Sequence, residues 1–245
     1  MEINIFDKKE DMGKCAAEKA AEIIKDTIKK KGQANFVMAA AASQFEFLKY
    51  LTRMSSIDWN KTTMFHLDEY IGLSENHPAS FRKYLKDRFI NKVYPGNIYL
   101  IKGDSKNPEQ ECDRLNRIIS DYVIDISFVG IGENGHLAFN DPPADFDIED
   151  PYLVVQLDEI CRKQQLGEGW FNNLDDVPKK AISMSIKQIM KSKNIICTVP
   201  DKRKAQAVRD CFKGDEISPN CPASILKKHD NCFIFLDENS SIYLK

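Results

Sequence analysis

Short runs of β-branched and aromatic residues alternate along this chain with longer segments whose apolar residues recur at helical spacing. We expect strands at residues 2–6, 35–40, 62–67, 97–101, 123–130, 152–157, 194–199 and 231–237. We expect helices at residues 11–31, 43–54, 77–89, 108–122, 158–165 and 201–212. The apolar segment 181–190 belongs to the same series, and its pattern assigns it to neither type.

This alternation predicts an α/β fold, in which a doubly wound, mostly parallel sheet carries helices on both faces in a Rossmann-like arrangement. Residues 123–130 are so apolar that we expect their strand to be buried on both faces. No internal repeat, low-complexity segment or linker interrupts the pattern. We therefore expect residues 1–245 to form a single domain.

Composition and charge argue against several classes of protein. The net charge is −2 and the basic residues are spread along the chain, so we expect no nucleic-acid partner. No apolar run approaches the roughly 18–20 residues of a membrane span, and the N-terminus lacks the pattern of a signal peptide. Seven cysteines lie at scattered spacings without a C-x-x-C pair. We therefore expect reduced thiols, no zinc site and a cytoplasmic protein.

The stretch GIGENGHLAFNDPP, residues 130–143, directly follows the most apolar predicted strand. Its G-x-G-x-x-G spacing is typical of dinucleotide sites, but the double proline leaves no room for the helix that such a site requires. We interpret it as a ligand-binding loop in which Gly132 and Gly135 allow close backbone approach. His136, with Asp141 nearby, could hold one tautomer and move protons near neutral pH. The alternative is a histidine that only holds a turn.

Two adjacent carboxylates, Asp68 and Glu69, follow the apolar strand predicted at 62–67. Neighbouring residues of an extended chain project to opposite sides, so one carboxylate can face a cleft while the other is solvated or paired. A catalytic aspartate here would need its pKa raised toward the working pH by burial or by a second acid. The alternative is a plain turn, since acidic residues commonly follow strands.

Two predicted helix starts could hold an anion. Ser43 and Glu46 form the S-x-x-E capping-box pattern, and the free N–H groups around Ser43 and Gln44 would also suit a phosphate. Residues 202–204, ending in Lys204, place three cations in the first turn of another helix, where each opposes the helix dipole by roughly 0.3–1 kcal/mol. A bound anion would reverse that penalty, whereas a solvated basic face is the alternative.

Five motifs follow one another along nearly the whole chain: FHLDEYIGL, HPASFRKYL, GIGENGHLAFNDPP, DVPKKAIS and DKRKAQAV. In this order they resemble the glucosamine-6-phosphate deaminase/isomerase family, whose superfamily includes 6-phosphogluconolactonase. The resemblance implies an aldose–ketose isomerase that converts an amino-sugar 6-phosphate to fructose 6-phosphate, or a related ketose phosphate, and ammonia. It implies a small sugar phosphate as the binding partner, with no metal or other cofactor. Assembly into a homo-oligomer is left open.

The resemblance also assigns roles to individual residues. Asp68 matches the base that moves a proton between C2 and C1 of the opened sugar. His136 matches the residue that assists ring opening, and Asp141 the acid that orients it. Asn134 stands where the family has Asp or Asn, and we expect it to bind or polarise the substrate. Lys204 matches the lysine that binds the phosphate.

Two segments depart from the family's pattern. The stretch MAAAASQ has Ala40 and Ala41 where the family carries threonine and glycine, so Ser43 and the helix start are left to bind phosphate. The stretch GEGWFNN lacks the family's arginine, for which Arg162 or Lys163 could substitute.

Two other functions remain as alternatives. One is a 6-phosphogluconolactonase-like hydrolase, although that branch shows D-E-R and D-G-H-T-A-S where this chain has LDEY and NGHLAFND. The other is a non-catalytic sugar-phosphate-binding protein, because the phosphate loop is altered. The short segment after the last predicted strand leads us to expect no strong allosteric control.

Overall fold

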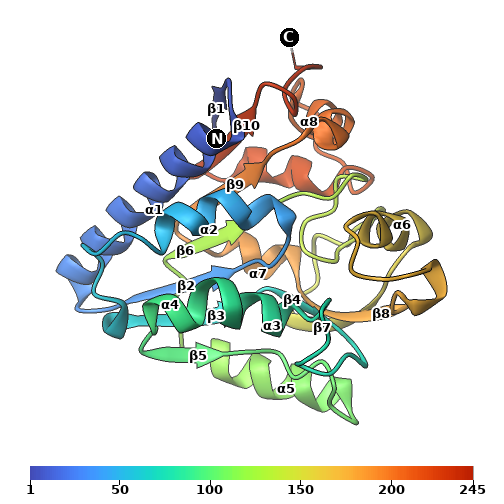
Figure 1. The fold of residues 1–245 in the computed structure, drawn as a ribbon, viewed down its shortest axis with the longest axis horizontal. Helices are drawn as coiled ribbons and strands as arrows, with labels where there is room; N and C mark the ends of the chain where they lie inside the picture. Colours follow the sequence, from blue (N-terminus) through green and yellow to red (C-terminus); the bar gives the residue numbers. More distant parts are fainter. Residues whose placement is uncertain (245) are drawn as a thin grey trace.

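The structure is a computed structural model that describes residues 1–244. Its main sheet has seven strands in the order β1-β10-β9-β6-β2-β3-β5, and every neighbouring pair is parallel (Figure 1). The strands are β1 (Glu2–Phe6), β2 (Ala34–Met38), β3 (Thr62–His66), β5 (Asn97–Tyr99), β6 (Ile126–Val129), β9 (Ile195–Val199) and β10 (Cys232–Asp237). The predicted doubly wound, mostly parallel α/β sheet is confirmed.

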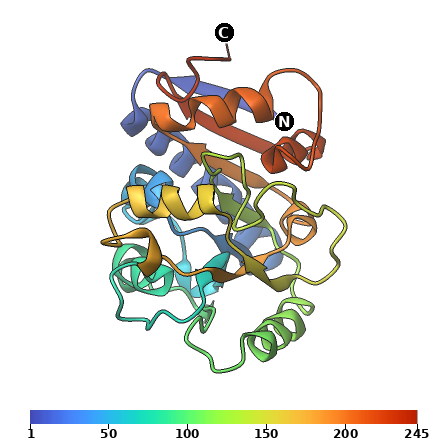
Figure 2. The same ribbon diagram turned by 90° about the vertical axis from the view of Figure 1, so that its right-hand side faces the viewer.

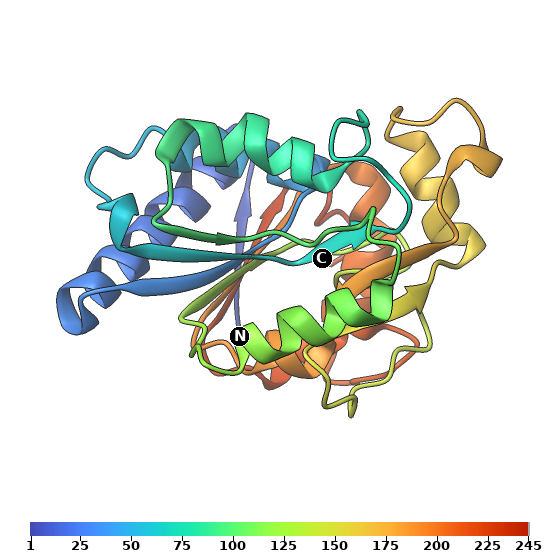
Figure 3. The same cartoon turned by 90° about the horizontal axis from the view of Figure 1, so that it is seen from below.

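Helices cover both faces of this sheet (Figure 3). One face carries α1 (Lys9–Lys31), α2 (Phe45–Leu51), α3 (Phe81–Leu85) and α4 (Asn91–Val93). The other carries α5 (Pro108–Ile119), α7 (Ile186–Met190) and α8 (Ala205–Phe212). The continuous apolar runs of the central strands follow from this arrangement, because a strand covered on both sides must be apolar at successive positions.

Alternate side chains of one strand enter two separate cores. In β2, Phe36 and Met38 pack on the α1 side, whereas Val37 packs on the α5 side. In β6, Phe128 packs on the α1 side and Val129 on the α5 side. The pleat of an extended chain requires this alternation. The two cores are therefore tied to one another through the backbone of each central strand.

A second, three-stranded antiparallel sheet lies outside the main one in the order β4-β8-β7. Its strands are β4 (Asp68–Tyr70), β8 (Lys180–Met184) and β7 (Tyr152–Gln156), and α6 (Glu159–Gly167) follows β7. The sequence predicts β7 as a strand but indicates neither the separate sheet nor β4. A strand of three residues is too short to show an alternating pattern, so its pairing depends on β8, far away in the chain.

Two predicted helices begin later than expected. The third begins at Phe81 because the Ser80 hydroxyl accepts a hydrogen bond from the Lys83 N–H and caps it. The second begins at Phe45, after a 3₁₀ turn at Ala42–Gln44. Ser43 therefore lies inside that turn and does not cap a helix, which excludes the capping-box interpretation.

Four adjacent central strands, β9, β6, β2 and β3, end at the same edge of the sheet, which Figure 2 faces. From β2 the chain continues outward to β3 and β5, whereas from β6 it continues in the opposite direction to β9 and β10. In open α/β sheets, ligands bind where the strand order reverses in this way. None of the helices within residues 1–244 has the length and apolar character needed to span a membrane.

Candidate active site

A pocket lies at the carboxyl ends of these four strands. The loops that follow β2, β3, β6 and β9 contribute to it from residues 39–43, 67–68, 130–139 and 200–204, and α6 and its C-terminal end contribute from 164–168. The four loops converge because parallel neighbours end together. Asp68, His136, Ser43 and Lys204 all line this pocket, so the structure brings four of the predicted site residues together.

Asp68 presents a carboxylate that is nearly free of partners. Its side chain is 6% exposed, and its Oδ1 atom has no hydrogen-bond partner among residues 1–244. Burial raises the pKa of Asp68 well above its ordinary value, and the neighbouring Glu69 carboxylate raises it further. A buried, unpartnered carboxylate that faces a pocket is free to accept a proton from a bound ligand.

Glu69 faces the opposite way and is fully engaged. Its carboxylate accepts hydrogen bonds from the backbone N–H groups of Tyr70, Phe81 and Arg82 and from the Ser80 hydroxyl. The Arg82 guanidinium lies 3.5 Å away. Burial raises the pKa of Glu69, although these donors oppose the shift. The adjacent acids of the sequence therefore have separate roles, Glu69 at the start of α3 and Asp68 in the pocket.

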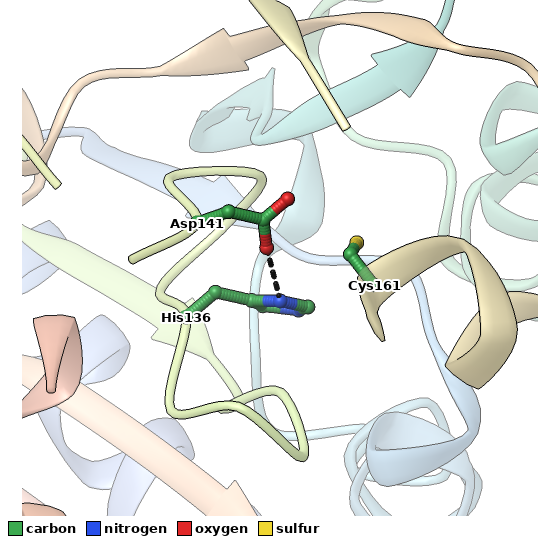
Figure 4. Close-up of side chains that lie close together, drawn as sticks. All are labelled: His136, Asp141 and Cys161. Carbon is green, nitrogen blue, oxygen red and sulfur yellow. Dashed lines mark hydrogen bonds and ion pairs between the residues drawn. The ribbon is translucent and has the colours of Figure 1, made fainter. Parts of the chain in front are cut away.

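His136 and Asp141 form the hydrogen-bonded pair that their spacing suggests (Figure 4). The distance from His136 Nδ1 to Asp141 Oδ1 is 3.0 Å. The Asn134 amide donates to the same Oδ1 atom at 2.9 Å and accepts the His136 backbone N–H at 3.1 Å. Burial alone would raise the pKa of Asp141, but the hydrogen bond and charge of His136 and the Asn134 amide hold it below its ordinary value. The pair is thus fixed from both ends.

The glycines of this loop allow the imidazole to lie flat against the backbone. A Cβ atom at Gly132 would come within 2.4 Å of the His136 ring, so only glycine fits there. Gly135 has a φ of +81°, which other residues rarely adopt. Neither glycine lines the pocket itself, whereas Gly130, which the sequence analysis did not select, does. A Cβ at Gly130 would lie 2.6 Å from the Ser43 hydroxyl.

Two non-glycine residues of the pocket loops have strained backbone. Ala138 has a φ of +52° and Asp201 a φ of +76°, each costing on the order of 1–3 kcal/mol. The buried Asp237 carboxylate holds the second of these, because it accepts the Asp201 backbone N–H. Such strain persists where the surroundings over-determine the conformation, and it is often found at ligand-binding loops.

The cationic end of the pocket is formed by Lys204 and Arg203. Lys204 is 5% exposed, and its ammonium has no hydrogen-bond or ion-pair partner among residues 1–244. Burial lowers the pKa of Lys204 to about 8, while the nearby Glu168 and Glu133 carboxylates act in the opposite direction. A buried ammonium without a partner is costly unless an anion binds beside it.

The sequence motifs and this geometry agree with the comparison to known proteins. A model of the family described as Glucosamine-6-phosphate isomerases/6-phosphogluconolactonase matches residues 7–235. The chain belongs to this family. The resemblance inferred from the five motifs is therefore confirmed.

Individual relatives within the family carry more specific names. Glucosamine-6-phosphate deaminase from Listeria monocytogenes is 36% identical over 228 residues, which are 93% of this chain and 95% of the relative. The deaminase from Lactobacillus delbrueckii subsp. bulgaricus is 31% identical over 245 residues, the full length of both proteins. A solved monomeric glucosamine-6-phosphate deaminase is 32% identical and superposes with a TM-score of 0.90, covering 99% of this chain and 100% of that one.

More distant members share the fold. A 6-phosphogluconolactonase from Shewanella baltica is 16% identical, with a TM-score of 0.80 over 97% of each chain. At this identity the likeness concerns architecture alone.

Two residues predicted for the family's phosphate site lie elsewhere. The Arg162 guanidinium donates to the backbone carbonyls of Leu174 and Val177, so it ties the 3₁₀ turn at Leu174–Asp176 to α6 and does not line the pocket. Lys163 pairs with Glu159 on the exposed side of α6. Neither residue lines the pocket in this structure, so the replacement of the family's arginine by either of them stays a prediction without support from the geometry.

Gln44 also differs from its expected position. Its amide donates to the Val129 carbonyl and to the Thr198 hydroxyl, and it is 1% exposed. It links the loop after β2 to β6 and β9 and leaves Ser43 as the polar side chain of this loop that lines the pocket. These bonds give Gln44 a structural role, and its contact with phosphate stays a prediction.

Several pocket residues were not indicated by the sequence. Gln164, Gln165 and Glu168 reach the pocket from α6 and its C-terminal end, and Phe81 and Phe139 form an apolar wall with their rings stacked at 5.7 Å. The one available signal is the run of polar residues QQLGE on a predicted helix, which any exposed helix could show. The residues of α6 reach the pocket because β7, the strand before this helix, places α6 beside it.

One cluster has the composition of a metal site. Ligand atoms of His136, Asp141 and Cys161 all lie within 4.8 Å of one another (Figure 4). His136 and Asp141 are already hydrogen-bonded to one another, and burial raises the pKa of the Cys161 thiol, which disfavours the thiolate that would bind a metal. The residues fit a hydrogen-bonded group, and the expected absence of a metal stays a prediction.

Proposed function

We propose that this chain is an amino-sugar-phosphate deaminase that converts a hexosamine 6-phosphate and water to fructose 6-phosphate, or a related ketose phosphate, and ammonia. One observation carries the proposal: a buried Asp68 carboxylate with a free oxygen shares its pocket with the His136–Asp141 pair and the unpaired Lys204 ammonium. Relatives named as glucosamine-6-phosphate deaminases, at 31–36% identity, support the same chemistry.

The pocket residues divide the reaction between them. His136, held by Asp141, would transfer the proton that opens the pyranose ring. Asp68 would then remove the C2 proton and return it to C1 through an enol-type intermediate, for which its raised pKa is suited. Water adds at C2 as ammonia leaves. Asn134 does not line the pocket, so we assign it the orientation of the pair rather than contact with the substrate.

Phosphate would lie at the other end of the pocket. Lys204, Arg203 and the Ser43 hydroxyl supply charge and hydrogen bonds there. Ala40 and Ala41 also line the pocket and offer only their backbone groups as hydrogen-bonding partners. Glu168 adds a negative charge close enough to Lys204 to affect its pKa. This mixed charge favours a sugar phosphate that also carries a cation, as an amino sugar does.

The test is the formation of ammonium and ketose 6-phosphate from glucosamine 6-phosphate by the purified protein, with galactosamine 6-phosphate in parallel. We expect one of the two sugars to give both products in equal amounts. 6-Phosphogluconolactone is the third substrate, because members of the family with that activity share the fold. Lactone hydrolysis without ammonium release would assign the chain to the other branch, and binding without any turnover would make it a sugar-phosphate-binding protein.

A further inference from the structure

Two cysteines lie directly behind the loop that carries His136. Cys211 is buried in α8, and Cys221 precedes the 3₁₀ helix at Pro222–Lys228 and is partly exposed. Both sulfurs lie beside the same residue, Gly135, so they are close to one another. The two residues lack the C-x-x-C spacing, because the chain folds back on itself to bring them together.

Both cysteines lie beside Gly135, the residue before His136. A Cβ atom at Gly135 would lie 2.9 Å from the Cys211 sulfur and 3.9 Å from the Cys221 sulfur. The Gly135 carbonyl also accepts a hydrogen bond of 2.9 Å from the Ala223 N–H, two residues after Cys221. The thiol pair and the His136 loop are therefore close neighbours, and the segment that follows Cys221 is hydrogen-bonded to the loop.

The two thiols differ in acidity and exposure. The neighbouring Cys211 thiol lowers the pKa of Cys221 to about 7, and the Lys227 charge acts in the same direction, while burial and the Asp210 and Glu216 charges oppose the shift. The neighbouring Cys221, together with burial, raises the pKa of Cys211. Cys221 is thus the more exposed and more acidic thiol and Cys211 the buried thiol beside it, an arrangement that suits a nucleophile and its resolving partner.

We propose that Cys211 and Cys221 form a peroxide-sensitive pair, whose oxidation to a disulfide displaces the His136 loop and lowers turnover. The Cys221 thiolate attacks a hydroperoxide, so that an S–O bond forms, the O–O bond breaks and the alcohol or water leaves with a proton. The Cys211 sulfur then attacks the sulfenic acid, forming the S–S bond and releasing water. Two thiols are oxidised and one hydroperoxide is reduced.

The displacement follows from bond lengths. A disulfide requires the two sulfurs to approach to about 2.05 Å, much closer than two thiols that are not bonded to one another. Both sulfurs pack against Gly135, so closing this distance changes the support of the loop. The His136 ring has little freedom to adjust, because it lies against Gly132 and is fixed to Asp141. Misplacing a catalytic group by about 1 Å can cost roughly 100-fold in rate.

The experiment treats the purified, reduced protein with hydrogen peroxide and measures intact mass, cross-linked peptides and turnover together. We expect a loss of about 2 Da, a peptide joining Cys211 to Cys221, and a fall in kcat of at least about tenfold that dithiothreitol reverses. Cys221→Ser should keep the basal kcat and lose the sensitivity. Cys15→Ser, a change at the other partly exposed cysteine, should stay as sensitive as the unmodified protein.

The expected effect on turnover rests on the proposed function. A second measurement tests the movement of the loop without assuming that function. Hydrogen–deuterium exchange of residues 130–143 should increase on oxidation and return to its initial rate on reduction, whatever the substrate. If no cross-link forms between the two cysteines, the proposed oxidation site is wrong. A cross-link that leaves both kcat and loop exchange unchanged overturns its coupling to His136.

Discussion

At the scale of single residues, Asp68 and Glu69 show how neighbours of the same chemistry acquire different properties. Both are buried, and burial raises the pKa of each. Glu69 is compensated by backbone donors and by Arg82, whereas Asp68 keeps an oxygen without a partner. The difference arises because successive side chains of β4 point to opposite sides.

Replacement of Asp68 tests its role as the base. Asp68→Asn keeps the shape of the side chain but cannot accept the C2 proton, so we expect kcat to fall by at least about 100-fold. Binding of the ketose product, measured by calorimetry, should change little. Asp87→Asn, a change on the exposed side of the α3 region, should leave both unchanged. An Asp68→Asn variant that retains most of its kcat would contradict the mechanism.

The pH dependence of kcat/KM tests Asp68 and Lys204 together. Asp68 must be ionised to act, so kcat/KM should fall as the pH drops through its raised pKa. Lys204 must be charged to bind phosphate and has a pKa of about 8, so kcat/KM should also fall as the pH rises above that value.

Lys204→Met isolates the alkaline limb of this profile. Loss of a charge-assisted hydrogen bond of about 1.5–3 kcal/mol should raise KM roughly 10- to 150-fold. The fall above pH 8 should disappear, because the group that titrates there is gone. If the variant keeps the alkaline limb, another group binds the phosphate.

At the scale of elements, the parts of the site that the sequence predicted are those with local signals. His136 and Asp141 occupy one loop, so their spacing alone brings them together. Gln164 and Glu168 reach the pocket only because the antiparallel strand β7 carries α6 over it, and that placement depends on pairing with β8. Arg162, on the same helix, faces the other way. A helix of this composition shows no periodicity that identifies its pocket side.

The N-terminal end of α3 is stabilised by Glu69 as well as by the Ser80 side chain that caps the helix. Glu69→Ala would leave three backbone N–H groups and Arg82 without their acceptor in a buried position. We expect the free energy of unfolding to fall by about 3–5 kcal/mol, as measured by urea titration. Glu75→Ala, which removes the exposed partner of Lys86, is the matched control and should leave the unfolding midpoint unchanged. Equal stability of the two variants would contradict this role.

At the scale of the whole molecule, the continuous apolar strands and short connections determine the fold, whereas assembly is not encoded in any pattern we recognise. One solved relative is a monomeric deaminase, and the homo-oligomer considered for this chain stays a prediction. Gel filtration with light scattering distinguishes the two, since a monomer has a mass of 28.1 kDa. The cytoplasmic location likewise stays a prediction.

Global stability should depend on pH through His66, a fully buried residue of β3. Burial, reinforced by the Arg82 charge, lowers the pKa of His66 to about 3, whereas an unfolded histidine titrates near pH 6.5. Between these values the unfolded chain binds a proton that the folded protein does not. The free energy of unfolding should therefore fall by about 1.4 kcal/mol for each pH unit below 6.5.

Urea titrations at several pH values between 7 and 5 measure this slope. His66→Gln should flatten it, although the variant is less stable at neutral pH because a buried side chain has been changed. His77→Gln, a change at a partly exposed position, should preserve it. An unchanged slope in His66→Gln would assign the acid sensitivity to the carboxylates.

The scattered origin of the pocket has a consequence for folding. Its walls come from loops between residues 39 and 204, and they meet only after β6 has paired with both β2 and β9. Pairing between parallel strands far apart in sequence is slow, because the entropy of closing a long loop is lost before any stabilising contact forms. Local helices such as α1 form much earlier. The active site is therefore completed late in folding. Turnover should recover during refolding when the native sheet forms, and not when the chain first becomes compact.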